Sequence, residues 1–556
     1  MIKDIKLKIG SHSESEKLLI ETTPVTIFVG PNNSGKSKVL TEIQEFCMSG
    51  LVNHTFSLVE DVSFNNIIEE NLANEIINNT LIPNPGERVN PGYMIFGNGK
   101  YRYQIPENLP KSFLVAPNSR KQEFCTYYLS NKTLKLDALN RITLINPKPL
   151  GDMQNLPENN LAILFSDDEK RLEVRRIIYE AFNSYFVIDP TNSGSLRIRL
   201  SKVEPQNHQQ ERGLHNEAVE FHRNALDISN ASDGVKAFTG IITSIIAGNP
   251  KITILDEPEA FLHPSLSFKL GKEISNSAKI EFNRLFVSTH SSNFLMGCIQ
   301  SGAPVNIVRL TYSNEIGTAR LLDKNKIETL MRDPLLRSTG ILNALFYKYV
   351  IVTEGDSDRA FYQEINERLI HFKPSEAIHD CLFINAVGKD TIWKIVKPLR
   401  EMGIPAVGIY DIDILKNDGS NWTNALKASF VPEISHQPLG QTRSLIKNMF
   451  STLGKDMKKD GGLDALLDSE REGANNLFNQ LEEYGIFTVR RGEVEHWLSN
   501  LGVKAHKSLW LSEIFLKMGA DPTDSNYLKP SNDDVWDFMN KISQWMSNEK
   551  RKGIPK

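Results

Sequence analysis

The octapeptide GPNNSGKS at Gly30–Ser37 limits the fold of this chain more than any other feature, because it stands between an apolar run, Pro24–Val29, and a helical segment, Lys38–Met48. A strand, a glycine-containing loop and a helix in this order form a cradle for phosphate groups. Glycines let the backbone approach the anion, and N–H groups at the helix N-terminus point toward it. We therefore expect an ATP-binding α/β domain whose phosphate-binding residues are Gly30, Asn32, Asn33, Ser34, Gly35, Lys36 and Ser37.

Within this loop, Lys36 would neutralise the β- and γ-phosphates and Ser37 would ligate Mg²⁺. A second apolar run ends in the adjacent carboxylates Asp256 and Glu257. Neighbouring residues of a strand face opposite ways, so the two side chains have different roles. We expect Asp256 to hold Mg²⁺ and Glu257 to act as general base. A third run leads into His290, which is placed to sense the γ-phosphate.

These segments resemble known ATPase motifs. Gly30–Ser37, Leu255–Pro264 and Ser288–Ser291 are similar to the Walker A, Walker B with D-loop, and switch-histidine segments of ABC-type ATPases, in the branch of RecF and the chromosome-maintenance proteins. In that family, a signature segment reaches across a dimer to the nucleotide of the other subunit. Ala231–Val235 resembles this signature, with Asp233 in place of the usual first glycine.

The resemblance implies that Ser232 and Gly234 contact nucleotide, and that the protein forms a homodimer or a higher homo-oligomer. The same Ser-Asp-Gly sequence is equally typical of a plain helix N-cap. Both interpretations remain open from the sequence.

A second α/β pattern follows in the C-terminal part of the chain. Carboxyl ends of strands in open α/β sheets carry binding sites, and a like-charged Asp pair facing one point is costly unless cations fill it. In an extended segment, Asp411 and Asp413 would project to the same side. Three apolar runs precede the polar motifs: Tyr349–Thr353 before Glu354 and Asp358, Leu382–Val387 before Gly388 and Lys389, and Pro405–Tyr410 before Asp411 and Asp413.

This series resembles the Toprim domain of topoisomerases, primases and related nucleases, and an ABC-type ATPase followed by Toprim resembles the OLD family of ATP-dependent nucleases of phage defence. The resemblance implies catalytic roles for Glu354, Asp411 and Asp413, with Asp358 as a further metal ligand. It also implies a two-metal centre, filled by Mg²⁺ or Mn²⁺, that another carboxylate and a lysine complete. Glu495 and Lys507 are the expected pair, with Glu493 and Lys504 as rivals.

The expected fold class is α/β, an ABC-type P-loop ATPase domain followed by a parallel-sheet Toprim domain. The expected boundaries are residues 1–320 for the ATPase, with an insertion at about 50–220, and 346–510 for Toprim, with a helical insertion at about 429–483. A helical linker, 321–345, and a helical tail, 511–556, complete the chain.

Composition narrows the compartment and the partners. The four cysteines form no CxxC pair, which is typical of reduced cytosolic thiols and argues against a zinc knuckle. No apolar stretch reaches the roughly 20 residues that span a bilayer, and the first residues lack the apolar core of a secretory signal, so we expect a cytoplasmic protein without membrane contact. The net charge is only −4, so any nucleic-acid surface must be local. Lys455, Lys458 and Lys459 form one basic cluster, which would be either a solvated face or a phosphate contact.

The resemblance thus implies an ATP-regulated, divalent-metal-dependent endonuclease that acts on DNA, expected to be double-stranded, in anti-phage defence. A defence-system partner protein or RNA would fit the same resemblance. None of the 14 tyrosines has a context that marks a nucleophile, which favours a nuclease over a topoisomerase. The alternatives are a non-cutting ABC-type ATPase that acts as a clamp or sensor, and an RNA-processing Toprim nuclease.

Overall fold

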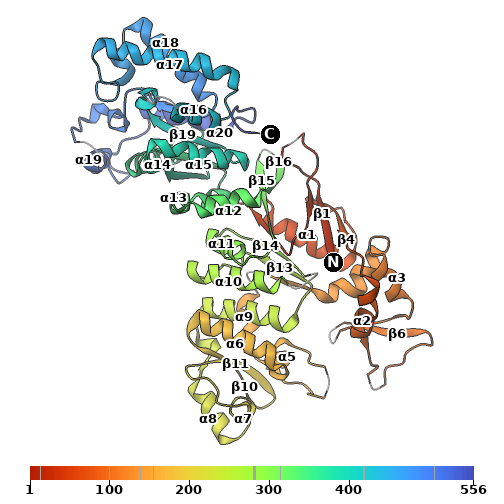
Figure 1. Ribbon diagram of the computed structural model, residues 1–556. Coiled ribbons are helices and arrows are strands. Elements are labelled where there is room, and N and C mark those ends of the chain that lie inside the picture. The colour runs from red at the N-terminus through yellow and green to blue at the C-terminus, as the bar shows by residue number, and fades with distance from the viewer. Residues whose placement is uncertain are drawn as a thin grey trace. The chain divides into compact units, whose positions relative to one another are not determined.

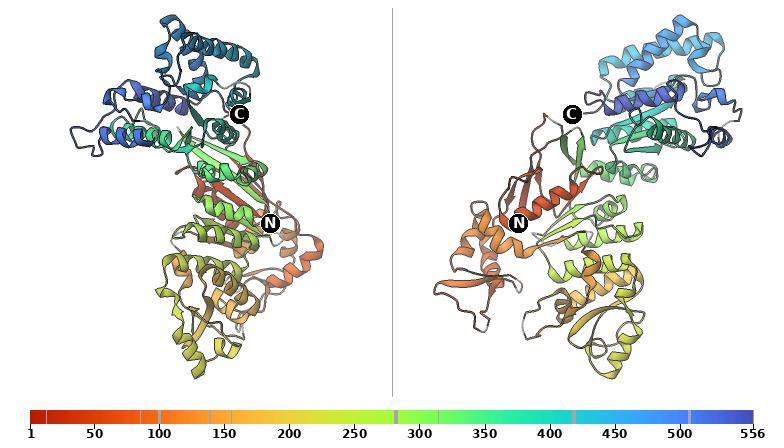
Figure 2. Two further views of the ribbon diagram at one scale, coloured as in Figure 1. Left: turned by 60° about the vertical axis from the view of Figure 1, so that its left-hand side comes forward. Right: turned by 180° about the vertical axis from the view of Figure 1, so that it is seen from behind.

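The computed structural model places the chain in two compact units, which are described separately. Unit 1 comprises Met1–Val29 and Asn33–Lys324, and unit 2 comprises Gly30–Asn32 and Asn325–Lys556. The described residues are 1–12, 14–84, 86–98, 101–137, 140–154, 156–279, 283–313, 315–416, 420–505 and 508–555. Figures 1 and 2 show the chain from three sides.

A six-stranded sheet in the order β16-β15-β3-β14-β13-β8 forms the centre of unit 1. All its neighbouring pairs are parallel except β15 with β16. The strands in the middle are almost entirely buried, which explains why their sequences are continuous apolar runs rather than alternating ones. Their bounds are β3 Val25–Val29, β8 Thr133–Leu136, β13 Ile252–Asp256, β14 Arg284–Ser288, β15 Val305–Ser313 and β16 Ile316–Leu322.

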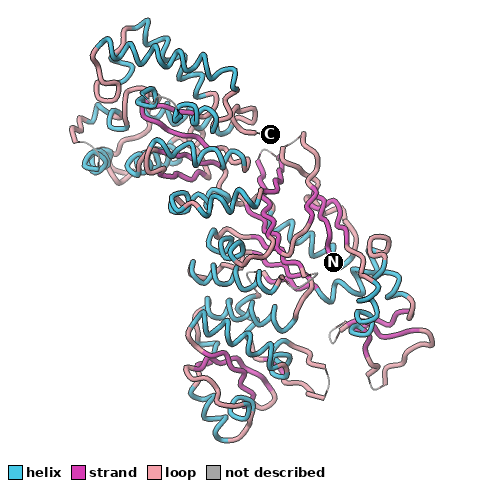
Figure 3. Tube along the Cα trace, viewed as in Figure 1, coloured by secondary structure: helices cyan, strands magenta, loops and turns pink. Residues whose placement is uncertain are grey.

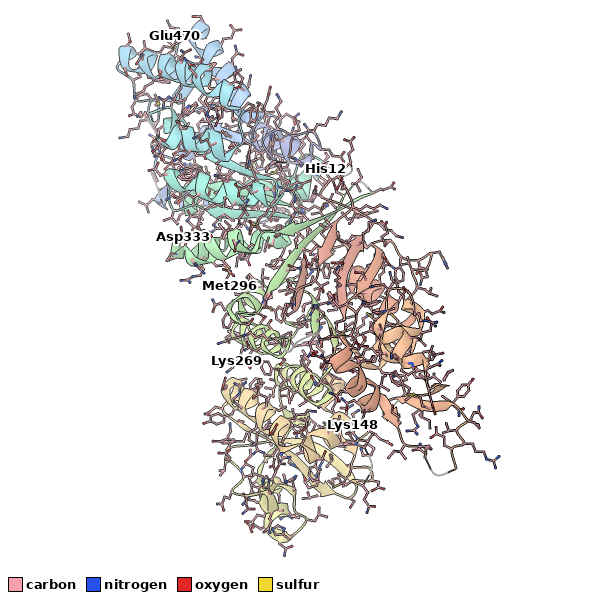
Figure 4. All side chains as sticks on the ribbon, turned by 45° about the vertical axis from the view of Figure 1, so that its right-hand side comes forward. His12, Lys148, Lys269, Met296, Asp333 and Glu470 are labelled. Atoms are coloured by element: carbon pink, nitrogen blue, oxygen red, sulfur yellow. The ribbon has the colours of Figure 1, made fainter. Side chains whose placement is uncertain are left out.

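Helices cover this sheet. The helix α1 packs against β13 and β14, and α10 packs against α11. Figure 4 labels Lys269 on α10 and Met296 on α11. The helix α9 contacts α10, α5 and α6. Their bounds are α1 Lys36–Ser49, α5 Asn160–Ser166, α6 Asp168–Phe182, α9 Asp233–Gly248, α10 Pro264–Ser277 and α11 Ser292–Gln300.

Three smaller antiparallel sheets complete unit 1. The segment expected as one insertion, residues 50–220, is divided by β8, which joins the central sheet. The sheets are β2-β1-β4, β5-β6-β7, and β10-β11-β12 with β9. Strand bounds are β1 Ile2–Leu7, β2 Leu19–Glu21, β4 Val59–Phe64, β5 Thr80–Leu81, β6 Tyr93–Gly97, β7 Arg102–Pro106, β9 Lys148–Pro149, β10 Tyr185–Asn192, β11 Ser195–Ser201 and β12 Leu226–Asp227. The accompanying helices are α2 Glu69–Asn79, α3 Leu109–Val115, α4 Lys121–Glu123, α7 His208–Arg212 and α8 Asn216–Asn224.

Unit 2 is built on a four-stranded parallel sheet in the order β18-β17-β19-β20, surrounded by helices (Figure 3). The strands are β17 Tyr349–Thr353, β18 Cys381–Asn385, β19 Ala406–Asp411 and β20 Ile486–Val489. The helices are α12 Lys324–Arg332, α13 Pro334–Ser338, α14 Asp356–Phe372, α15 Lys389–Glu401, α16 Ser420–Ala428, α17 Glu433–Leu453, α18 Asp468–Glu482, α19 Ser508–Met518 and α20 Asp534–Ser547.

Tryptophans of the last two helices belong to the core of unit 2. Trp510 on α19 and Trp536 on α20 are buried with Phe361 and Val407 in one hydrophobic cluster. Burying an aromatic side chain contributes on the order of 2–3 kcal/mol. The C-terminal helices are therefore part of this domain's core.

A single buried guanidinium ties several parts of unit 2 together. Arg400, at the end of α15, donates hydrogen bonds to the carbonyls of Ser429 at 3.2 Å, Tyr484 at 2.7 Å and Gly553 at 3.0 Å. Ser429 and Tyr484 lie at the two ends of the helical insertion, which comprises α17 and α18. The insertion therefore leaves the domain and returns to it at one point.

No helix in the described part of the chain is both long and apolar enough to cross a membrane.

Candidate nucleotide and nuclease sites

The phosphate-binding loop leaves β3 at Val29 and enters α1 at Lys36. Asn33 and Gly35 have φ angles of 59° and 93°, in the left-handed region that favours glycine. A Cβ on Gly35 would lie 2.9 Å from Leu58 Cδ1, so a side chain there would also meet a neighbour. Lys36 is buried, and its ammonium donates to Ser34 Oγ at 3.4 Å. The loop thus has the strained, tight conformation that close approach of backbone to phosphate requires.

Two hydroxyls converge on the carboxylate expected to hold Mg²⁺. Ser37 Oγ donates to Asp256 Oδ1 at 3.0 Å, and Ser288 Oγ donates to the same oxygen. A hydroxyl and a carboxylate oxygen side by side are hard ligands of the kind that Mg²⁺ prefers. These residues therefore fit the ion that the ATPase fold implies, and Ser37 and Asp256 could hold it.

Glu257 begins a tight turn at the end of β13. Its φ angle is 49°, uncommon for a residue with a side chain, and its N–H donates to the carbonyl of Ser288 at 3.0 Å. His290 Nε2 lies 3.4 Å from Glu257 Oε1. The expected base and the expected γ-phosphate sensor therefore lie together at the carboxyl edge of the sheet, although the two residues come from different strands.

Glu259 anchors the histidine. Its Oε1 accepts a hydrogen bond from the His290 N–H at 2.7 Å, and burial raises the pKa of its carboxyl above the usual range. Sequence reasoning assigned no role to Glu259. Its place three residues after Asp256 in the D-loop was the available signal.

Arg141 supports the same turn and was also missed. This residue is 1% exposed and begins a short helix, Arg141–Ile145. Its guanidinium donates to the backbone carbonyls of Asp256 and Glu257, and to that of Asp137 at 3.1 Å. Carbonyl groups carry no sequence signal, so no motif could have identified this contact.

The signature-like segment forms the start of α9. Ser232 is the N-cap residue, yet its side chain makes no capping hydrogen bond and is exposed. A Cβ on Gly234 would lie 2.7 Å from the carbonyl oxygen of Phe261 in the D-loop. Close packing of α9 on the D-loop explains the glycine. The hydroxyl of Ser232 is accordingly not used for the N-cap that the sequence offered as an alternative.

The second site lies at the carboxyl edge of the unit 2 sheet. Glu354 follows β17 and Asp411 ends β19, and these two strands are neighbours. The Asp411 N–H donates to Glu354 Oε1 at 3.0 Å. Asp358 lies in the first turn of α14, where its Oδ2 accepts from the Gly355 N–H at 2.8 Å. The parallel register brings together carboxylates that are 57 residues apart in the chain.

The expectation that Asp411 and Asp413 lie in one extended segment was wrong. The strand β19 ends at Asp411, and Ile412–Lys416 form a 3₁₀ helix that contains Asp413. The Ile412 N–H donates to the Gly492 carbonyl, which bends the chain away from the sheet. Asp413 Oδ2 accepts from Lys389 Nζ at 2.8 Å, while its Oδ1 is buried without a hydrogen-bond partner.

Electrostatics at this site favour bound cations. Burial, followed by the neighbouring carboxylates, raises the pKa of Glu354 to about 7 and that of Asp411 to about 8. Burial and then Glu495 also raise the pKa of Asp358. Within the described residues, no three His, Cys, Asp or Glu side chains form a ready-made metal site. The buried unpaired Oδ1 of Asp413 and the all-oxygen donor set nevertheless fit a hard divalent ion.

The sequence also predicted a further glutamate and a lysine for this site, with Glu493, Glu495, Lys504 and Lys507 as the candidates. Glu493 Oε2 lies 3.4 Å from Lys458 Nζ, and the same ammonium lies 2.5 Å from Asp411 Oδ2. Glu495 is close enough to affect the pKa of Asp358, so both glutamates belong to the cluster. Lys504 is exposed, and Lys507 lies outside the described residues. Lys458, from the basic cluster of the insertion, reaches this centre, and so does Lys389, which pairs with Asp413.

Comparison with known proteins agrees with this pair of domains. Residues 145–296 match the family described as "AAA domain, putative AbiEii toxin, Type IV TA system", a range that contains Asp256, Glu257 and His290. Residues 345–413 match "Overcoming lysogenization defect protein-like, TOPRIM domain", which contains Glu354, Asp358 and Asp411. The chain is an ATPase domain joined to a Toprim domain. The Toprim domain is of the OLD-like kind, which confirms the resemblance to that family.

Several solved structures of SMC head domains are similar to part of the chain. The SMC head bound to the C-winged helix domain of ScpA has 14% identity and a TM-score of 0.35, and covers 59% of this chain and 99% of its own. The SMC head domain from Thermotoga maritima has 16% identity and a TM-score of 0.29, covering 58% of this chain and 99% of its own. The Pyrococcus furiosus Smc head bound to the C-terminal domain of ScpA has 13% identity and a TM-score of 0.30, and covers 60% of this chain and 98% of its own. No curated protein sequence matches the chain.

Proposed function

We propose that this protein is an ATP-regulated, divalent-metal-dependent endonuclease that acts on double-stranded DNA in anti-phage defence. The observation that carries the proposal is the carboxylate cluster of Glu354, Asp411 and Asp413 at the carboxyl edge of an OLD-like Toprim sheet. The raised pKa values of Glu354 and Asp411 at such an edge support a functional site over a solvated turn. The defence role is supported by the family resemblance.

In the ATPase domain, the assignment rests on three contacts. Lys36 is held buried at the start of α1, where its charge would neutralise the β- and γ-phosphates. Ser37 and Asp256 would hold Mg²⁺. Glu257 and His290, 3.4 Å apart, would orient the attacking water and sense the γ-phosphate. The proposed nucleotide is ATP.

In the Toprim domain, a pair of divalent ions would activate water and stabilise the leaving 3′ oxygen. Glu354, Asp411 and Asp413 would hold these ions, with Asp358 and one of the glutamates Glu493 and Glu495 completing the set. The carboxylates bind the ions only when deprotonated. The raised pKa values of Glu354 and Asp411 therefore imply that the ions displace protons as well as ammonium groups.

The proposed assembly is a homodimer or higher homo-oligomer. The exposed Ser232 side chain and the packing of Gly234 on the D-loop leave the start of α9 available to a nucleotide on another subunit. A helix N-terminus favours anions, and this one points no capping side chain at its own N–H groups.

The test is incubation of the purified full chain with supercoiled plasmid in Mg²⁺ or Mn²⁺, with and without ATP. We expect nicked or linear products that require the divalent ion. Competition with structured RNA separates DNA cleavage from RNA processing. Plasmid that stays intact under every condition, in a protein that hydrolyses ATP, would contradict the proposal.

One observation favours a second candidate, a non-cutting ATPase clamp or sensor. Lys389 and Lys458 already pair with Asp413 and Asp411, as they would in a purely structural cluster. The two candidates differ in metal binding: a structural cluster takes up no divalent ion at Asp411, whereas a nuclease centre does.

A further inference from the structure

The loop between α17 and α18 sends one lysine into the carboxylate cluster. Lys458 Nζ lies 2.5 Å from Asp411 Oδ2 and 3.4 Å from Glu493 Oε2. Its side chain is 31% exposed, against 12% for Asp411. Lys458 therefore bridges Asp411, the last residue of β19, and Glu493 in the segment after β20.

The backbone of this loop is fixed against the site. Asp456 Oδ1 accepts the N–H groups of Lys458 at 2.9 Å and Lys459 at 3.1 Å, while its Oδ2 accepts from Lys416 Nζ at 3.0 Å. A Cβ on Gly492 would lie 2.3 Å from the Lys458 carbonyl, so the loop packs directly on the backbone there. The loop backbone is therefore held against the site, and the Lys458 side chain extends from it to Asp411.

The charges around Lys458 are unbalanced. The ammonium of Lys458 faces the carboxylates of Asp411 and Glu493. Glu354, Asp358 and Glu495 share the same cluster, whereas the second ammonium, that of Lys389, pairs with Asp413. The cluster therefore contains more carboxyl groups than Lys458 and Lys389 pair with.

An ammonium group and a divalent ion cannot both occupy the position beside Asp411 Oδ2. Like charges a few Å apart repel by several kcal/mol at the effective dielectric of a half-buried site. The lysine stem is flexible and has four rotatable bonds, so its head group can move by several Å while the backbone stays in place.

We propose that Lys458 is the resident cation of the nuclease centre: it neutralises Asp411 and Glu493 until a divalent ion takes its position, and then faces the scissile phosphate. The inference rests on the proposed metal-dependent nuclease function. It gives the loop of the insertion a direct part in the site, in the role for which the sequence offered Lys504 or Lys507.

The test measures Mn²⁺ binding to the nucleotide-free full chain by isothermal titration calorimetry. Lys458→Met removes the competing charge, so its Mn²⁺ affinity should be about tenfold higher than that of the wild type. Lys458→Arg keeps the charge and should bind Mn²⁺ no more tightly than the wild type. The control is Lys459→Met, which removes the same charge from the next residue of the loop and should leave the affinity unchanged. Asp411→Asn should abolish the site.

A second measurement follows plasmid cleavage at saturating Mn²⁺. Lys458→Met should cut at least about tenfold more slowly because the ammonium facing the phosphate is lost, and Lys459→Met should cut at the wild-type rate. If Lys458→Met proves unstable without metal, Lys458→Gln, which can still hydrogen-bond to Asp411, provides the same comparison.

The outcomes separate this inference from the proposed function. Unchanged Mn²⁺ affinity in Lys458→Met, in a protein that cuts DNA, overturns the role of Lys458 alone. Tighter Mn²⁺ binding by Lys458→Met without any cleavage by the wild type supports the resident cation and overturns the nuclease. If neither the wild type nor Lys458→Met binds Mn²⁺ in a way that depends on Asp411, the role of Lys458 and the proposed nuclease function are both overturned.

Discussion

The guanidinium of Arg141 donates a hydrogen bond to the backbone carbonyl of Glu257, the residue to which we assign water activation. The contact fixes a turn in which Glu257 has a positive φ angle, and a second bond holds the preceding carbonyl of Asp256. Arg141 touches neither reacting group, so it acts as a positioning residue.

Substitution of Arg141 should therefore slow hydrolysis more than it weakens nucleotide binding. In Arg141→Gln, Glu257 loses its fixed position, and kcat for ATP should fall by roughly 10- to 100-fold while KM changes little. Arg141→Lys keeps the charge but lacks the planar fork that bonds two carbonyls, so it should restore only part of the rate. Steady-state ATPase kinetics, with fluorescent-nucleotide binding as a second readout, check this. An equal loss of binding and turnover would argue for general damage instead.

The phosphate-binding loop and the base should give opposite phenotypes. Lys36→Ala removes the charge that neutralises the phosphates, so ATP affinity should fall. Glu257→Gln leaves the binding groups intact and removes the water-activating carboxylate, so the protein should retain bound ATP without hydrolysing it. Nucleotide retained after gel filtration distinguishes the two variants. Wild-type turnover in either one would contradict its assignment.

Single substitutions should abolish DNA cleavage without abolishing ATP hydrolysis. Asp411→Ala and Glu354→Ala each remove a ligand from a shared centre, so DNA cleavage should be lost while ATP hydrolysis continues. Asp356→Ala is the matched control: it removes a carboxylate between Glu354 and Asp358 whose side chain is 70% exposed and pairs with Arg359. Both activities are assayed on one preparation of each variant, and thermal unfolding of the same preparation excludes general damage to the fold. Cleavage at the wild-type rate by Asp411→Ala would favour the non-cutting ATPase.

Close packing at the start of α9 predicts a defect in the assembled ATPase. In Gly234→Ala, the new methyl group would lie 2.7 Å from the Phe261 carbonyl and must displace the D-loop or the helix. We expect ATP turnover and ATP-dependent self-association to fall by roughly tenfold. Gly248→Ala, at the other end of α9, meets its nearest neighbour at 3.9 Å and should behave as the wild type. Sedimentation velocity with ATP measures the association.

A buried carboxylate gives a stability test that is independent of catalysis. Asp189 is 0% exposed and accepts hydrogen bonds from Thr191 and Arg199 at 2.6 Å each. Burial alone would raise the pKa of Asp189, but these partners lower it to about 2. Because its folded-state pKa is lowered, ionised Asp189 stabilises the fold at pH values above its unfolded pKa, which is near 4. This contribution to the free energy of unfolding disappears as the pH falls toward 2. Asp189→Asn should cost about 2 kcal/mol at pH 7 by urea unfolding, and less below pH 4.

The strands and loops that bear the sites could be predicted because each is a local pattern. A continuous apolar run before a glycine or carboxylate motif gave β3, β13, β17 and β19 with their site residues at the carboxyl ends. Parallel pairing then explains why Glu354 and Asp411 meet.

The residues that the sequence did not assign act through contacts without local pattern. Arg141 bonds to backbone carbonyls more than 100 residues away, and Lys458 reaches Asp411 from an insertion whose lysines look like any solvated basic cluster. The turn at Asp413 was also not predictable, because it depends on the Gly492 carbonyl that meets Ile412.

The bonds that Arg400 makes to the carbonyls of Ser429 and Tyr484 have a consequence for the evolution of this domain. A segment whose ends meet on a fixed frame can change its length at little entropic cost and without disturbing the sheet. A segment of different length or sequence could therefore take the place of this insertion while the sheet keeps its structure. Any replacement would have to return a positive side chain to the place of Lys458, so a segment that can change its length would carry one residue that cannot change.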